Sequence, residues 1–124
     1  MVAGLEITSV EHAGCCVLTA AGELDMVRAR ALEVALIRHT TNDMPLVLDL
    51  TGLRFMDSSG LYIVLRTSNE FRRLNQRFVL VPSKIVMRLV EVAGMKDILT
   101  ICPTVEDALA HVGSPMTQSE TSSR

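Results

Sequence analysis

The chain has 124 residues, 48% of them hydrophobic and 21% charged, which predicts one globular domain with a packed core and excludes a disordered chain. Twelve basic and fourteen acidic residues leave a net charge of -2, and this argues against a general nucleic-acid-binding protein, which needs a basic excess. One Tyr, three Phe and no Trp are too few for a base-stacking platform, and no apolar run approaches the ~20 residues of a membrane span.

The first predicted elements are two strands joined by a tight turn. Residues 5–10 alternate roughly between apolar and polar side chains, which is typical of a half-buried strand. Residues 15–21 are nearly all small or apolar, so we expect a strand that is covered on both faces. Ala13-Gly14 forms the turn between them, and residues 22–25 break the second strand. The two strands should therefore form an antiparallel hairpin.

A helix is expected next, with Asp25 as its N-cap and residues 26–39 as its body. Ala29, Leu32 and Leu36 fall on one stripe that would face the core. The helix has more apolar residues than one stripe buries. The excess is either exposed or packed at a sheet edge or under the C-terminal tail, and it includes Met26, Val27 and Ile37.

The remaining elements alternate between strands and helices. Residues 46–50 form an apolar run that predicts a central buried strand, and residues 51–56 are expected to be a connection. The later elements are expected, in chain order, to be a helix from residue 57 to about 74, a strand at 78–81, a helix from Ser83 to Gly94, a strand at 98–102 ended by Pro103, and a helix from Thr104 to 112.

The element order β-β-α-β-α-β-α-β-α predicts an α/β domain. Alternating strands and helices favour right-handed crossovers onto a largely parallel sheet, so the sheet should be mixed, with the antiparallel hairpin at its N-terminal end. We place this single domain at residues 1–113. The polar residues 114–124 are expected to form a disordered tail.

The three cysteines, Cys15, Cys16 and Cys102, predict neither a disulfide nor a metal site. Their number is odd, and adjacent cysteines on a strand point to opposite faces. We interpret them as small core residues of a protein in a reducing cytosol. His39 and His111 are expected to be surface residues at helix ends.

Enzymatic chemistry finds little support in the sequence. Ser58 and Gly60 make half of the nucleophile elbow G-x-S-x-G, but Met56 occupies the place of the first glycine. The possible bases fall in a turn, a helix end and the last helix: His12, His39 and His111. Neither Gly-rich phosphate-binding pattern occurs, and Asp25 and Asp57 are each explained as helix caps. We therefore predict no catalytic residue, no cofactor and no metal.

Residues 57–60, Asp-Ser-Ser-Gly, admit two interpretations. One is a plain helix cap followed by a flexible glycine. The other is a regulatory phosphorylation site, because free backbone N–H groups and the helix dipole at a helix start can accommodate a phosphate. A phosphate would add about −1.5 to −2 charges to the surrounding surface, and this could change binding while leaving the fold intact.

Three segments together resemble the STAS-domain family. They are G-E-L-D at 22–25, L-V-L-D-L at 46–50 and F-M-D-S-S-G-L at 55–61. Within that family, the chain is similar to the bacterial anti-sigma factor antagonists, also called anti-anti-sigma factors. The similarity covers about residues 4–112, and residues 86–94 also resemble the third helix of the family.

The resemblance implies a partner-switching protein rather than an enzyme. In the family, the serine directly after the Asp is phosphorylated by the anti-sigma factor, a serine kinase, and this position is Ser58 here. The unphosphorylated form would bind the kinase and free the sigma factor, and a metal-dependent serine phosphatase would restore that form. Such a protein is cytoplasmic, with no nucleic-acid partner and no membrane span.

The residues that would bind the partner, carried over from the resemblance, are Asp25, Asp57, Ser58, Ser59, Gly60 and Tyr62. Tyr62 departs from the family pattern, in which many members have a small residue, and a tyrosine beside Ser58 could alter the choice of partner, so the resemblance does not identify the cognate kinase. Two other classes stay open. One is a scaffolding STAS domain of a sensory or lipid-transport complex with Ser58 unmodified, and the other is a small hydrolase.

The two adjacent serines should have different roles. We expect Ser59 to be the N-cap, with its hydroxyl on the N–H of Leu61 or Tyr62. Ser58 would then lie just before the helix with a free side chain. Gly60, which has no β-carbon, would let the backbone of a partner approach closely.

Overall fold

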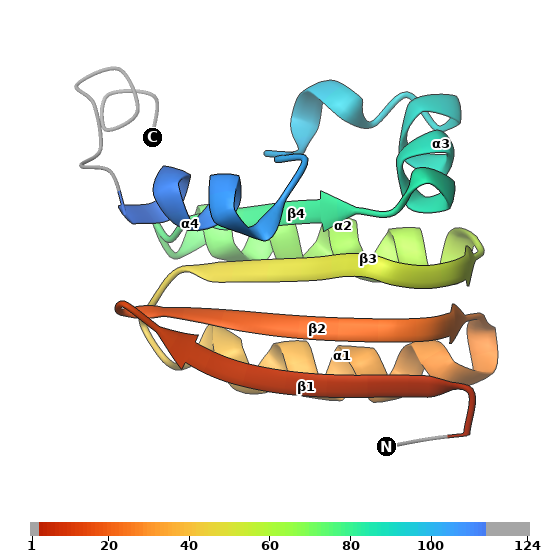
Figure 1. Ribbon diagram of the computed structural model, residues 1–124, viewed down its shortest axis with the longest axis horizontal. Coiled ribbons are helices and arrows are strands. Elements are labelled where there is room, and N and C mark those ends of the chain that lie inside the picture. The colour runs from red at the N-terminus through yellow and green to blue at the C-terminus, as the bar shows by residue number, and fades with distance from the viewer. Residues whose placement is uncertain (1–2, 114–124) are drawn as a thin grey trace.

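The computed structural model describes residues 3–113, so the tail predicted at residues 114–124 lies outside the described part of the chain. Its elements, in chain order, are β1 (Leu5–His12), β2 (Cys15–Leu24), α1 (Met26–Thr40), β3 (Leu46–Met56), α2 (Ser58–Arg73), β4 (Phe78–Pro82), α3 (Lys84–Val92), the 3-10 helix η1 (Lys96–Ile98) and α4 (Val105–Gly113). They form a four-stranded sheet in the order β1-β2-β3-β4 (Figure 1). The β1–β2 pair is antiparallel and the other two pairs are parallel, which confirms the predicted α/β mixed sheet and its N-terminal hairpin.

The two faces of the sheet are covered by different helices. Helices α1 and α2 lie side by side on one face, and α4 lies on the other face near β4 (Figure 1). Strand β3 shows how the alternation of a strand serves both layers. Leu48 belongs to the core cluster that includes Leu32 of α1 and Val64 of α2, whereas Val47 packs with Ala108 of α4.

Strands β2 and β3 are longer than predicted. Residues 22–24 of the expected break and the expected connection at 51–56 are instead strand, with Glu23 opposite Phe55 and Leu24 opposite Met56, and β2 ends just before Asp25. Two register shifts, opposite the steps from Thr19 to Ala21 and from Gly22 to Glu23, let the pairing continue, with the extra residue in β3 each time. Gly22 was expected to break the strand, but it permits a close approach, because a β-carbon there would lie 2.1 Å from the carbonyl oxygen of Gly4.

The predicted fifth strand at residues 98–102 is wrong. Residue 98 ends η1, and only Ile101 pairs with β4, as an isolated parallel bridge to Leu80. The Leu80 N–H donates to the Thr100 carbonyl at 2.8 Å, and the Leu80 carbonyl accepts from Cys102 at 3.0 Å. The next donor in a parallel ladder would be residue 82, which is a proline without an N–H, so the ladder stops there.

The predicted N-caps of α1, α3 and α4 are confirmed. Asp25 accepts the N–H of Arg28 at 3.0 Å, Ser83 accepts that of Val86 at 3.3 Å, and Thr104 accepts that of Asp107 at 3.1 Å. No helix within residues 3–113 is both long enough and apolar enough to span a membrane.

The cysteines are free and lie in or against the core. Cys15 and Cys16 are buried and Cys102 is half-buried, and burial raises the pKa of the thiols of Cys15 and Cys102. His39 lies at the end of α1 as predicted, but it is half-buried and not fully exposed. Its Nδ1 lies 3.3 Å from the Cys16 sulfur and its Nε2 lies 3.1 Å from the Ser9 hydroxyl, and burial lowers the pKa of its imidazole.

Candidate functional site

The two strand–helix junctions that the sequence singles out meet at one edge of the sheet. Because β2 and β3 are parallel neighbours that end at the paired residues Leu24 and Met56, α1 and α2 begin next to each other. A backbone hydrogen bond of 3.2 Å from the Asp57 N–H to the Leu24 carbonyl ties the junctions together. The sheet thus brings Asp25 and Asp57, the two N-caps, to the same end of the molecule.

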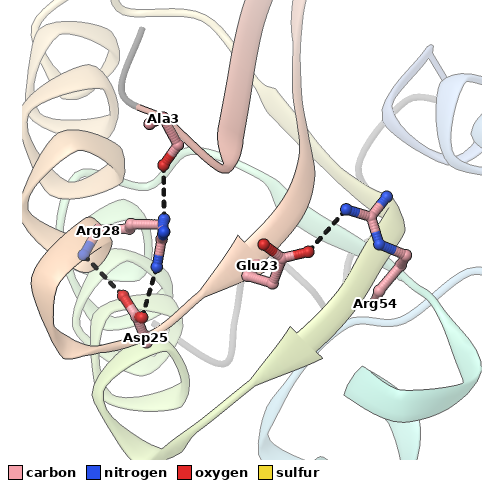
Figure 2. Close-up of polar contacts among 5 residues, drawn as sticks. All are labelled: Ala3, Glu23, Asp25, Arg28 and Arg54. Atoms are coloured by element: carbon pink, nitrogen blue, oxygen red, sulfur yellow. Dashed lines mark hydrogen bonds and ion pairs between the residues drawn. The ribbon is translucent and has the colours of Figure 1, made fainter.

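The carboxylate of Asp25 is held by its own helix. One oxygen accepts the Arg28 N–H, and the other pairs with the Arg28 guanidinium at 2.6 Å, as Figure 2 shows. Arg28 also donates from Nε to the Ala3 carbonyl at 2.6 Å, so it fastens the chain before β1 to the start of α1. The hydrogen bond from the Arg28 backbone, together with the charge of its guanidinium, lowers the pKa of the Asp25 carboxyl.

A second ion pair crosses the ends of β2 and β3. Glu23 and Arg54 approach to 2.6 Å between Oε2 and Nη2 (Figure 2). The pair joins the segments that were expected to lie outside the sheet. It is exposed, so its electrostatic contribution to stability is small.

The start of α2 differs from the prediction. Asp57, not Ser59, is the N-cap: it has extended backbone, and its Oδ1 accepts the N–H of Ser59 at 2.9 Å. Ser58 is the first residue of the helix and is exposed, whereas Ser59 is the second and is half-buried. The carboxylate takes the capping role because it stands one residue before the helix, where a side-chain acceptor reaches the first-turn N–H groups.

Gly60 is needed for packing inside the domain. It is buried, and a β-carbon there would lie 2.7 Å from the Cγ atom of Met56 and 2.8 Å from a methyl carbon of Leu24. The absence of a side chain therefore lets α2 lie against the ends of β2 and β3. The expectation that this glycine leaves space for the backbone of a partner is wrong, because the space belongs to these two side chains.

A hollow lies between the first turns of α1 and α2. Ser58 and Ser59 line it from α2 together with Tyr62, and residues of α1 form the opposite wall: Met26, Ala29, Arg30 and Glu33. Tyr62 is 60% exposed, and the Arg66 guanidinium carbon lies 5.7 Å from its ring centroid. Arg66 pairs with Glu33 at 2.7 Å, and this contact bridges the two helices beyond the hollow.

The sequence prediction missed Arg30 and Glu33 as residues near Ser58. They belong to α1 and reach the site only because both helices start at the same edge of the sheet. Their helical spacing from Met26 was a usable signal, since residues three, four and seven positions apart share a helix face. The same helix start exposes Met26 and Val27, at 73% and 81%.

The described residues give Ser58 no histidine base. His39 lies near the far end of α1 from Met26, about 20 Å along the helix axis. His12 pairs with Cys15 at the start of β2, the opposite end from the junctions, and His111 belongs to α4 on the other face of the sheet. Within residues 3–113, no group of three or more His, Cys, Asp or Glu side chains could hold a metal ion.

Comparison with known proteins gives consistent results. A family model described as STAS domain matches residues 6–108. The anti-sigma-F factor antagonist RsfB of Mycobacterium tuberculosis is 32% identical over 110 residues, covering 87% of this chain and 89% of RsfB. RsfA, an anti-sigma-F factor antagonist of the same organism, is 28% identical over 110 residues, covering 86% of each chain. The crystal structure of an anti-sigma factor antagonist from Mycobacterium paratuberculosis has a TM-score of 0.80 at 29% identity, covering 89% of this chain and 95% of that one.

Proposed function

The chain belongs to the STAS domain family, and we propose that it is an anti-sigma factor antagonist whose binding is switched off by phosphorylation of Ser58. The observation that carries this proposal is the exposed Ser58 at the first position of α2, directly after a capping carboxylate that leaves its hydroxyl free. The partner would be an anti-sigma factor that is also a serine kinase, and both would act in the cytoplasm of a bacterium.

In the unphosphorylated state, the edge with Ser58 would bind the anti-sigma factor and so release the sigma factor. The kinase would then transfer the γ-phosphoryl group of ATP to Ser58. A new bond forms between Oγ and phosphorus, the bond from phosphorus to the β,γ-bridging oxygen breaks, ADP leaves, and the hydroxyl proton passes to a base of the kinase. The nucleotide and the catalytic groups belong to the kinase, so this chain acts as its substrate and ligand.

The phosphate would switch binding through charge. It adds about −1.5 to −2 charges beside the Asp57 carboxylate, and burying that charge in an interface is costly. The fold tolerates the phosphate because it sits at the positive end of the α2 dipole. Hydrolysis by a serine phosphatase would restore the neutral hydroxyl. Asp57, Ser59 and Tyr62 lie beside Ser58, and Asp25 caps the neighbouring helix start at the same edge; all four are proposed to shape the partner interface.

Kinase treatment followed by peptide mapping tests this proposal. The protein is incubated with ATP and the anti-sigma factors of its source organism, and phosphate is located by mass spectrometry. We expect modification of Ser58, loss of modification in Ser58→Ala, and normal modification in the matched control Ser59→Ala. Absence of phosphate and of kinase binding would favour a scaffolding STAS domain with Ser58 unmodified.

A further inference from the structure

We propose that Arg30 of α1 binds the phosphate of phosphorylated Ser58 and holds it in the hollow between α1 and α2. This inference rests on the proposed phosphorylation and adds a residue of the other helix to the switch. Met26 and Ser58 are the first residues of two helices that begin next to each other, and Arg30 lies one turn beyond Met26. Arg30 and Ser58 therefore line the same hollow from opposite walls.

The neighbouring arginines already have ion-pair partners, so Arg30 is available to bind a phosphate. Arg66 pairs with Glu33 and lies over the ring of Tyr62, and Arg28 pairs with Asp25. Within residues 3–113, Arg30 is the cation lining the hollow that forms no ion pair. A new anion at Ser58 would face one guanidinium without an ion pair, while Glu33 is already paired with Arg66.

The chemistry of the two groups is matched. A guanidinium presents planar N–H donors that bind a phosphate bidentately, and its charge would offset the repulsion between the phosphate and Asp57. Ser58 and Arg30 are both exposed, so neither side chain has to leave a buried position to pair across the hollow. Phosphorylation would then add charge to the partner surface and also close the hollow beside Met26.

The test uses the full chain with phosphoserine placed at position 58 during translation, so no kinase is involved. Phosphorus NMR gives the pKa of the second ionisation of the phosphate, near 6 in phosphoserine. The charged and titratable groups that line the hollow or adjoin it are Arg30 and Glu33 of α1, the N-cap Asp57, and Tyr62 and Arg66 of α2. A paired guanidinium favours the dianion, so Arg30→Gln should raise this pKa by about half a pH unit, the size of an exposed ion pair.

Two further variants make the result specific. Arg38→Gln removes the same charge from the same helix two turns further on, about 12 Å along the axis, which exceeds the Debye length of about 8 Å at 0.15 M salt. It should leave the pKa of the phosphate unchanged, and Arg30→Lys should give an intermediate value. Raising the salt to 1 M should remove most of the difference between Arg30→Gln and the parent protein.

Equal values in Arg30→Gln and Arg38→Gln would overturn the inference, and so would a larger effect of Arg66→Gln than of Arg30→Gln. Circular dichroism of each variant checks that it is folded. If kinase treatment labels Ser58 while Arg30→Gln leaves the phosphate unaffected, only the role of Arg30 fails. If no kinase labels Ser58 while Arg30→Gln raises the pKa of the phosphate, the proposed function fails, but the pairing of Arg30 with a phosphate on Ser58 is supported.

Discussion

The two strand–helix junctions are both capped by an aspartate, but they leave different groups accessible. Each begins a helix with an aspartate in extended backbone, at the same end of the sheet. Asp25 has both oxygens occupied by Arg28, and exposed Met26 and Val27 follow it. Asp57 caps with one oxygen and is followed by an exposed hydroxyl. The first junction is thus a structural clamp with an apolar rim, and the second presents a group that can be modified.

The largest effect is expected from a charge at the second junction. Ser58→Glu should weaken binding of the anti-sigma factor by about 100-fold, or roughly 2.7 kcal/mol, because a carboxylate would have to be desolvated beside Asp57. Ser58→Ala should bind as tightly as the unmodified protein and remain bound in the presence of ATP. Titration calorimetry gives both affinities. Equal affinities of the two variants would show that charge at this position does not control binding.

Gly60→Ala should be the most destabilising small change at the second junction. The added methyl would press on Met56 and Leu24, which are both buried, and the strain should exceed the gain in helix propensity. We expect a net loss of about 1–2 kcal/mol in the free energy of unfolding, measured with urea. Ser58→Ala, at an exposed position of the same helix, is the control and should lie within about 0.5 kcal/mol of the parent. A stable Gly60→Ala protein would mean that α2 can move away from the strands.

The capping assignment at the second junction gives a pair of opposite expectations. Asp57→Ala should cost about 1 kcal/mol of unfolding free energy, because the Ser59 N–H loses its acceptor. Ser59→Ala should cost less than about 0.5 kcal/mol, since its hydroxyl is not the cap. Urea denaturation of the two variants measures both values. The reverse order would restore Ser59 as the N-cap.

The smallest effect is a pH dependence at the first junction. The pKa of Asp25 is lower in the folded chain than in the unfolded one, so below about pH 4 the unfolded state binds the extra proton. The stabilisation is therefore fully present above the unfolded pKa and is lost as the pH falls through the folded pKa. The stability difference between the parent protein and Asp25→Asn, which keeps a cap but removes the charge, should be larger at pH 6 than at pH 3. A difference that is equal at both pH values would contradict the clamp.

Local rules predicted the starts of α1, α3 and α4, while the extent of the sheet depended on distant partners. Asp25, Ser83 and Thr104 are caps because a short polar side chain stands before an apolar periodic segment, and nothing far away is needed. Residues 51–56 include a threonine, a glycine and an arginine and do not suggest a strand by themselves. They become one because β2 pairs with them across two register shifts. The same kind of distant effect removed the expected fifth strand.

The candidate site likewise combines features that follow from local sequence with features that depend on distant contacts. Ser58 was predicted as a free hydroxyl at a helix start, and its exposure agrees with that prediction. The cap beside it was expected to be Ser59 and is Asp57. The role of Gly60 depends on Met56 and Leu24, and the second of these belongs to another strand. Arg30 enters the site only through the packing of α1 beside α2. Relations of this kind require the tertiary structure.

Pro82 helps to protect one edge of the sheet against aggregation. A protein that exchanges partners must keep its β-sheet margins from recruiting other chains, since an unpaired outer strand invites intermolecular strand addition and aggregation. On β4, residues 100–102 already occupy the backbone groups of Leu80, and Pro82 withholds the next donor. The opposite margin, β1, carries the exposed acidic side chains Glu6 and Glu11. One margin is thus protected by backbone hydrogen bonds and a proline, and the other by acidic side chains.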